Sequence, residues 1–287
     1  MDGHALLDRA VERLEASDAI DHWQKDRDLI DAEDLLAHAL GVDVFDPDDE
    51  VPPAARRRFE RFVERRATGE PVPLIKGYAE FRGMELIAKA GVFVPRASSE
   101  FLAEQAIRRL RRRSAPVHVD VATGAGAVAL AVAHEVPHAQ AYGSDIARDA
   151  VTVARANARR LGLANASFMV GDLFGAFPKR LRGVVDVVTL HPPYVARDEM
   201  RELPEEIVAW EPAHTLTDRS VDGLGLIGRT ADEAGSWLRS GGWLAIEVSP
   251  DRARAVSSVM RAAGFVDLKS TVEREFRVSR VVVGRWR

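Results

Sequence analysis

The sequence contains no cysteine, and only five of its 40 basic residues are lysine. The absence of cysteine excludes disulfide bonds and zinc sites built on thiolates. No apolar stretch approaches the roughly 20 residues that a membrane-spanning helix needs. The first residues, Met1 to His4, show neither the basic nor the apolar region of a secretory signal. We therefore expect a cytoplasmic protein that does not associate with membranes.

The chain has 287 residues, of which 46% are hydrophobic and 29% charged, enough for one large domain and a small one. Its net charge of −4 conceals an acidic first lobe, because residues 1–50 hold sixteen Asp or Glu against four Arg or Lys. This charge disfavours nucleic acid and would suit a basic partner surface, although a solvated acidic face on small helices explains it as well. We expect no direct nucleic-acid binding.

Apolar residues at helical spacing predict a small helical domain over residues 1–68. Three stripes carry this prediction, and the third follows Pro52-Pro53. Their members are Leu7, Val11 and Leu14 in the first, Leu29, Ala32, Leu36 and Ala39 in the second, and Phe59, Phe62, Val63 and Arg66 in the third. In the third helix Arg56 and Glu60 are spaced to form an ion pair.

Residues 69–98 are predicted to form a connecting β-hairpin, because short apolar runs at 73–78, 84–87 and 92–94 alternate with turn residues. Ser98 or Ser99 is positioned to cap the helix that follows. The remainder, 99–287, is expected to be the catalytic domain.

That domain begins with the pattern of a βαβ unit. A strand at 117–121, a turn of small residues at 122–126, a helix at 127–135 and a strand at 140–145 follow one another, and the last strand ends in Asp145. Small residues let a ligand approach the backbone at a helix N-terminus, and a carboxylate at this position accepts hydrogen bonds from ribose hydroxyls. A ligand that contains a nucleoside is predicted.

The choice of nucleoside is open from this unit alone, because Gly124, Gly126 and Ala129 also fit the dinucleotide pattern of an NAD enzyme. Asp120 favours S-adenosylmethionine, since a carboxylate there would repel a pyrophosphate and attract the ammonium group of a methionine moiety. A further strand at 166–170 delivers Gly171 to Phe174, where an adenine amino group could be received. Histidines 118, 134 and 138 lack metal-ligand spacing, and we expect no metal site.

The stretch 184–194 is the segment around which the rest of the chain is arranged. Its first seven residues read as a strand buried on both faces, and His191-Pro192-Pro193-Tyr194 leaves that strand in a rigid extended turn. Ligands bind at the carboxyl ends of parallel strands, so this turn is a candidate site. A proline-stiffened loop without function is the alternative.

The chain resembles the HemK/PrmC family, whose members use S-adenosylmethionine to methylate the glutamine of the GGQ loop in peptide chain release factors. The resemblance runs from the helical leader to the last strand. Its motifs are Gly69-Glu70-Pro71-Val72, Glu80-Phe81-Arg82-Gly83, Val94-Pro95-Arg96 with Glu100, the turn 120–126, Asp145, Gly171-Asp172, Pro192-Pro193-Tyr194, Glu211-Pro212, Asp222-Gly223-Leu224, Gly241-Gly242, Glu247 and the tail 278–285.

The resemblance implies a Rossmann-like α/β methyltransferase sheet with an antiparallel strand near its end. It also implies a set of cofactor-binding residues: Asp120, Ala122, Thr123, Gly124, Ala125, Gly126, Asp145, Asp172, Leu173 and His191. Residues 122–126 would line the methionine end, Asp145 would bind the ribose, and Asp172 with Leu173 would lie beside the adenine. His191, Pro192, Pro193 and Tyr194 would hold the substrate, and His191, Pro192 and Tyr194 would act in catalysis.

The chain departs from the family pattern at three places. His191 replaces the Asn of Asn-Pro-Pro-Tyr, Ala122 replaces a glycine, and Ala97 to Glu100 replace Pro-Glu-Thr-Glu. The alanine is a mild change if its φ is negative. A histidine accepts one hydrogen bond from an amide and can also take a proton, which suits an amine or hydroxyl acceptor.

We therefore predict an S-adenosylmethionine-dependent N-methyltransferase that modifies a release-factor glutamine. A paralogue acting on another protein side chain or on a small molecule, at nitrogen or oxygen, is the alternative. A non-catalytic S-adenosylmethionine-binding protein and an NAD-dependent oxidoreductase are the remaining alternatives.

Overall fold

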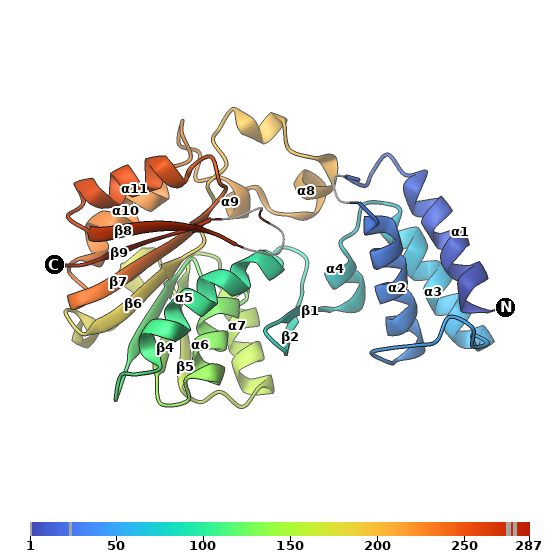
Figure 1. Ribbon diagram of the computed structural model, residues 1–287, viewed down its shortest axis with the longest axis horizontal. Helices are drawn as coiled ribbons and strands as arrows, with labels where there is room; N and C mark the ends of the chain where they lie inside the picture. The colour runs from blue at the N-terminus through green and yellow to red at the C-terminus, as the bar shows by residue number, and fades with distance from the viewer. Residues whose placement is uncertain (1, 23–24, 274–276, 278–279) are drawn as a thin grey trace.

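The computed structural model describes residues 2–22, 25–273, 277 and 280–287. Its N-terminal part is a bundle of α1 (Gly3–Glu15), α2 (Arg27–Leu40) and α3 (Pro53–Arg66), at the right of Figure 1. The predicted stripes form its core, except that Leu29 is 40% exposed and Leu35 fills the buried position of α2 instead. The predicted pair of Arg56 and Glu60 is present, with Nε and Oε1 3.6 Å apart.

The connecting region differs in part from the prediction. A hairpin forms between β1 (Tyr78–Phe81) and β2 (Met84–Ile87), but the run at 73–76 lies in a short helix, α4 (Val72–Lys76), and 92–94 is not a strand. The helix is favoured because prolines fit the first turn, where backbone N–H groups have no helical partner. Gly77, at a φ of 81°, ends it.

The C-terminal part is a doubly wound α/β sandwich around a seven-stranded sheet in the order β5-β4-β3-β6-β7-β9-β8. Its strands are β3 (Val117–Val121), β4 (Gln140–Asp145), β5 (Ala166–Val170), β6 (Val185–Leu190), β7 (Leu238–Val248), β8 (Val266–Val272) and β9 (Arg280–Arg285). Strands β3 to β7 run parallel, and β9 is antiparallel to both neighbours. The predicted fold class is confirmed, while residues 278–279 of the predicted last strand lie outside the described residues.

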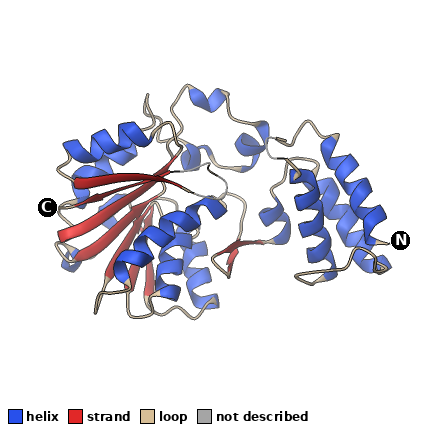
Figure 2. Cartoon of the chain, in the orientation of Figure 1, coloured by secondary structure: helices blue, strands red, loops and turns tan. Residues whose placement is uncertain are grey.

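Helices cover both faces of the sheet, as Figure 2 shows by colour. One face packs against α5 (Glu100–Leu110), α6 (Ala127–Glu135) and α7 (Arg148–Arg160), and the other against α10 (Gly225–Ala234) and α11 (Ala253–Ala262). Burial on both faces explains the unbroken apolar character of β6, whose six residues are all buried. Among the described residues, no helix is both long and apolar enough to cross a bilayer.

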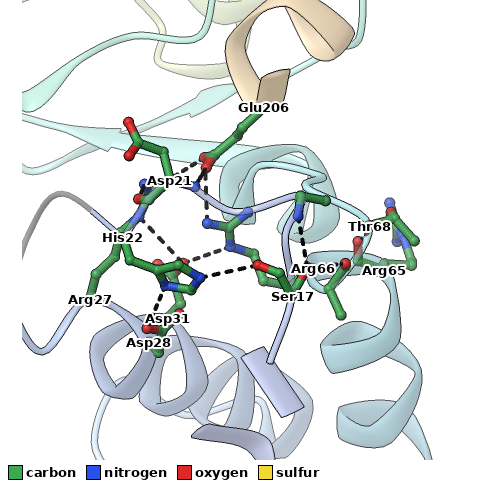
Figure 3. A network of polar contacts seen from close by, with 12 residues as sticks. Ser17, Asp21, His22, Arg27, Asp28, Asp31, Arg65, Arg66, Thr68 and Glu206 are labelled. Carbon is green, nitrogen blue, oxygen red and sulfur yellow. Dashed lines mark hydrogen bonds and ion pairs between the residues drawn. The ribbon is translucent and has the colours of Figure 1, made fainter. Parts of the chain in front are cut away.

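The segment between β6 and α10 carries the short helices α8 (Glu205–Trp210) and α9 (Ala213–Leu216), which lie above the sheet in Figure 1. Helix α8 reaches the helical bundle through a group of buried or half-buried charges, which we call the junction cluster. Its members are Arg27, Asp31, Arg66 and Glu206, shown in Figure 3.

Glu206 is the centre of the junction cluster. Its Oε1 accepts from Arg27 Nη2 at 2.5 Å and from Arg66 Nη2 at 3.4 Å, and its Oε2 accepts from the backbone N–H of Asp21 at 2.9 Å. Arg66 is only 1% exposed and donates from Nε to Asp31 Oδ2 at 2.6 Å. Arg66 Nη1 is buried without a hydrogen-bond partner among the described residues, so the pairing is not complete. The contacts of Glu206 with Arg27, Arg66 and the Asp21 backbone nevertheless hold α8 against the bundle.

Candidate active site

A cavity of about 320 Å³ lies at the carboxyl ends of β3, β4, β5 and β6. Parallel strands present their following turns at one edge of a sheet, which brings residues far apart in sequence onto one wall. The predicted residues on that wall are Asp120, Ala122, Thr123, Gly124, Ala125, Asp145, Asp172, Leu173, His191, Pro192 and Pro193.

Two predicted site residues lie elsewhere. Gly126 sits beneath the turn, where an added Cβ would be 2.9 Å from Phe168 Cζ, so its absent side chain permits close packing. Tyr194 is turned toward a second hollow, beside Ser249 and Arg252. Burial raises the pKa of its phenol to about 12, and the negative charge of Glu247 contributes. Neither residue lines the cavity, although the Tyr194 ring stacks on that of His191, and their predicted contacts with ligands stay predictions.

The turn after β3 is strained at Ala122. Its φ is 54°, in the left-handed region, so the condition under which the loss of glycine would be mild is not met. Gly124, at 55°, and Gly126, at 88°, adopt similar φ values without a side-chain penalty.

Replacing Ala122 with glycine should stabilise the protein by about 0.5–1 kcal/mol, because relief of the left-handed alanine exceeds the added entropy of the unfolded chain. Urea unfolding of the two proteins measures the difference. Ala125→Gly in the same turn is the control, since Ala125 does not have a positive φ and should lose stability. An Ala122→Gly variant less stable than its parent would contradict this reading of the turn.

Asp145 connects β4 to the turn after β3. Its Oδ2 accepts from the Gly124 N–H at 2.9 Å, and its Oδ1 accepts from the Ala147 N–H at 2.8 Å. Burial raises the pKa of this carboxyl, while these backbone hydrogen bonds oppose the rise. The carboxylate therefore orders the turn and also stands on the cavity wall.

Asp120 is almost completely buried and accepts two hydroxyl hydrogen bonds, from Thr123 Oγ1 and from Thr189 Oγ1, both at 2.6 Å. Burial raises its pKa to about 6 against the effect of these bonds. His118 Nε2 lies 2.9 Å from Thr189 Oγ1, and burial lowers the pKa of His118 to about 3. His118 is thus a neutral core residue that supports Thr189.

His191 stands where β6 ends, with its ring held on two sides. Its centroid is 5.4 Å from that of Phe93 in an edge arrangement and 6.0 Å from that of Tyr194 in a stacked one. Its Nδ1 lies 3.1 Å from Ser99 Oγ and 3.9 Å from Glu247 Oε2. The predicted capping role of Ser98 or Ser99 is wrong, because neither side chain caps α5. Ser98 Oγ instead donates to Glu247 Oε1, and Ser99 Oγ contacts His191.

Sequence reasoning missed the opposite wall of the cavity. It comes from residues 91–99 and from the segment after β6, and it includes Arg96, His214, Thr215, Thr217, Asp218 and Arg229. Arg229 Nη2 pairs with Asp172 Oδ2 at 2.5 Å. The motifs Glu211-Pro212 and Asp222-Gly223-Leu224 flank this segment and were the available signal. Across the described residues, there is no cluster of acidic, histidine or cysteine side chains suited to a metal ion.

The sheet order and the carboxylates at the carboxyl ends of β3 and β4 point to a class of protein, and comparison with known proteins agrees. Residues 113–247 match the model of a methyltransferase domain. A methyltransferase structure from Pyrococcus furiosus superposes with a TM-score of 0.53 at 14% identity, covering 80% of this chain and 98% of its own. A T. thermophilus 16S rRNA methyltransferase also gives 0.53, at 18% identity, covering 73% and 50%. The protein is an S-adenosylmethionine-dependent methyltransferase, as predicted.

The family follows from the whole chain. Residues 5–77 match the PrmC N-terminal domain. A release factor glutamine methyltransferase from Xylella fastidiosa is 35% identical, covering 98% of this chain and 97% of the relative. Another, from Burkholderia pseudomallei, is 36% identical, covering 86% and 88%. The chain belongs to the release factor glutamine methyltransferase family, which confirms the predicted resemblance.

Proposed function

We propose that this enzyme methylates the side-chain amide nitrogen of a glutamine in a peptide chain release factor. One observation carries the proposal: the cavity holds the carboxylates Asp120 and Asp145 on one side and the motif His191-Pro192-Pro193 on another. Family membership over nearly the full chain supports the choice of substrate.

The residues on the wall fit S-adenosylmethionine, which supplies a methyl group on a positively charged sulfur. Asp120 would face the ammonium group, whose positive charge favours the ionised carboxylate against the effect of burial. Asp145 would accept hydrogen bonds from the ribose. Leu173 would provide an apolar surface for adenine beside Asp172, and its own backbone is held by Ser144 Oγ, which donates to the Leu173 carbonyl at 2.9 Å.

At the acceptor end, the task of the protein is orientation. An amide nitrogen is a poor nucleophile, so a site that holds it in line with the methyl group lowers the barrier by positioning. The carbonyl of Pro192 and the imidazole of His191 would accept its N–H hydrogen bonds. Two consecutive prolines stiffen the backbone that places them.

A second candidate function rests on His191 itself. Because this residue stands where the family pattern has asparagine, the acceptor could be another protein side chain or a small molecule, methylated at nitrogen or oxygen. Such an acceptor needs a group that takes a proton, which imidazole provides and an amide does not.

We further propose that residues 1–68 form a substrate-recruiting domain, that 69–98 connect it and that 99–287 form the catalytic domain. The junction cluster supports these separate roles. It joins the bundle to α8, and α8 lies in the same segment as α9, which lines the cavity. A release factor that docks on the helical bundle would thus be placed relative to the cavity. The acidic first fifty residues suit a basic docking surface.

Incubation of the purified enzyme with a release factor and labelled S-adenosylmethionine should add one methyl group to one glutamine, found by mass spectrometry of the digested factor. A factor with that glutamine replaced by alanine is the control and should remain unlabelled. Labelling of a different side chain, or of a small molecule only, would replace the proposed function by the second candidate.

A further inference from the structure

Three side chains from separate parts of the chain meet behind the acceptor end of the cavity. His191 follows β6, Ser99 precedes α5, and Glu247 lies near the end of β7. The imidazole Nδ1 is 3.1 Å from Ser99 Oγ and 3.9 Å from Glu247 Oε2. Two departures from the family pattern, at 97–100 and at 191, are therefore in contact.

Glu247 is the unusual member of this group. It is 1% exposed, and its Oε1 accepts one long hydrogen bond, 3.3 Å, from Ser98 Oγ. Its Oε2 is buried without a hydrogen-bond partner among the described residues. A buried carboxylate oxygen left unpaired is costly, so a group that can offer it a proton or a positive charge is stabilised there. The imidazole of His191 is such a group.

This arrangement favours a proton on one of the two ring nitrogens, because the Ser99 hydroxyl can either accept from Nδ1 or donate to it whereas Glu247 can only accept. A carboxylate only accepts hydrogen bonds, so a proton on Nδ1 is favoured on the side that faces Glu247. The lone pair then belongs to Nε2, which forms no hydrogen bond with the described residues, and His191 lines the cavity. Phe93 and Tyr194 restrict rotation of the ring.

We propose that His191 is the proton acceptor of the methyl transfer and that Glu247 and Ser99 are its positioning residues. The proposal rests on the proposed function. As the acceptor nitrogen bonds to the methyl carbon, the carbon–sulfur bond breaks and its electron pair stays on sulfur. The nitrogen loses one proton to His191 Nε2 and keeps the electrons of that bond. The imidazolium faces the Glu247 carboxylate until it passes the proton to water.

The test compares His191→Asn, Glu247→Gln and Ser99→Ala, with His134→Asn as a matched control. His134 is an exposed histidine near the C-terminal end of α6, whereas the cavity is lined by residues at the start of that helix. Single-turnover methylation of the release factor gives the rate of the chemical step. His191→Asn should lose about 100-fold or more in this rate, the ordinary contribution of a general base. Glu247→Gln should lower kcat at unchanged KM, Ser99→Ala should do so to a smaller extent, and the control should match the parent. An Asn variant at least as active as the parent overturns the proposal.

The pH profile adds a readout that a merely structural role would not change. The parent rate should rise with pH, because only neutral imidazole accepts a proton, and the His191→Asn profile should lose that rise. Other groups near the ring are Glu247, Arg96, which lies over the Phe93 ring at 5.0 Å, and the buried phenol of Tyr194. Arg96→Met should therefore keep the rise that His191→Asn removes. A rise retained in His191→Asn contradicts the proposal.

Nitrogen-15 NMR of the histidine rings separates this inference from the proposed function, because it needs no substrate. With S-adenosylhomocysteine bound, neutral His191 should carry its proton on Nδ1, and Glu247→Gln should weaken that preference. A proton on Nε2 overturns the inference whatever the substrate is. If the proton is on Nδ1 but the enzyme leaves release factors unmodified, the proposed substrate is wrong and the inferred role of His191 as proton acceptor still stands.

Discussion

Replacing Asp145 with alanine should weaken binding of S-adenosylhomocysteine by about 2–4 kcal/mol, on the order of 30- to 1,000-fold in affinity. The variant would lose the proposed charged acceptor for two ribose hydroxyls. It also loses the bonds from the backbone N–H groups of Gly124 and Ala147, so the turn that should receive the ligand is less well ordered. Isothermal titration calorimetry measures the change, with NAD as a comparison ligand that should bind poorly to the parent.

Asp149→Ala is the matched control for this experiment. Asp149 lies four residues further along, at the exposed start of α7, where its contact is a surface pair with Lys89 at 3.8 Å. It should bind the ligand like the parent. Circular dichroism should show that both variants are folded. Unchanged affinity in Asp145→Ala would show that the ribose lies elsewhere.

Replacing Arg66 with methionine should lower the free energy of unfolding by about 3–5 kcal/mol, the usual cost of removing one partner from a buried ionic group. Arg66 is 1% exposed, and its loss leaves Asp31 without its main partner near Glu206. Burial already raises the pKa of Asp31, and Arg66 provides the largest opposing effect. Urea unfolding followed by circular dichroism measures the loss.

Two further proteins make this result specific. Arg56→Met removes a partner from the surface pair with Glu60 and should cost no more than about 1 kcal/mol. Arg66→Met combined with Asp31→Leu should recover part of the loss, because no unpaired carboxylate remains at position 31. If Arg66→Met stays within the range of the surface variant, the junction cluster does not stabilise the fold.

The parts of the structure that the sequence predicts are those that local patterns determine. The strands 117–121, 140–145 and 166–170 have the predicted bounds, because alternation, turn glycines and helix periods all agree there. The positions of Asp120, Asp145 and His191 on one cavity follow from a rule about the ends of parallel strands.

The wrong or missing predictions concern runs too short to show a period, and contacts between residues far apart in the sequence. The run at 73–76 is apolar and short, so periodicity does not distinguish strand from helix, and the prolines at its start decide the outcome. Ser99 contacts His191, a residue 92 positions away, instead of capping its own helix. The wall formed by His214, Thr217 and Arg229 depends on how a long segment returns over the sheet. The motifs that flank this segment mark it in the sequence but do not determine its path.

The junction cluster has a consequence for the order in which the protein is made. The last of the three bundle helices ends at Arg66, whereas Glu206 is added 140 residues later. Until then Arg66 has Asp31 as its acidic partner, and the backbone N–H of Asp21 lacks the carboxylate that it later meets. The newly synthesised bundle is thus expected to remain incomplete until the segment that passes over the cavity has been translated. A bundle expressed alone should keep that unfinished state and unfold more readily than the same residues within the whole enzyme.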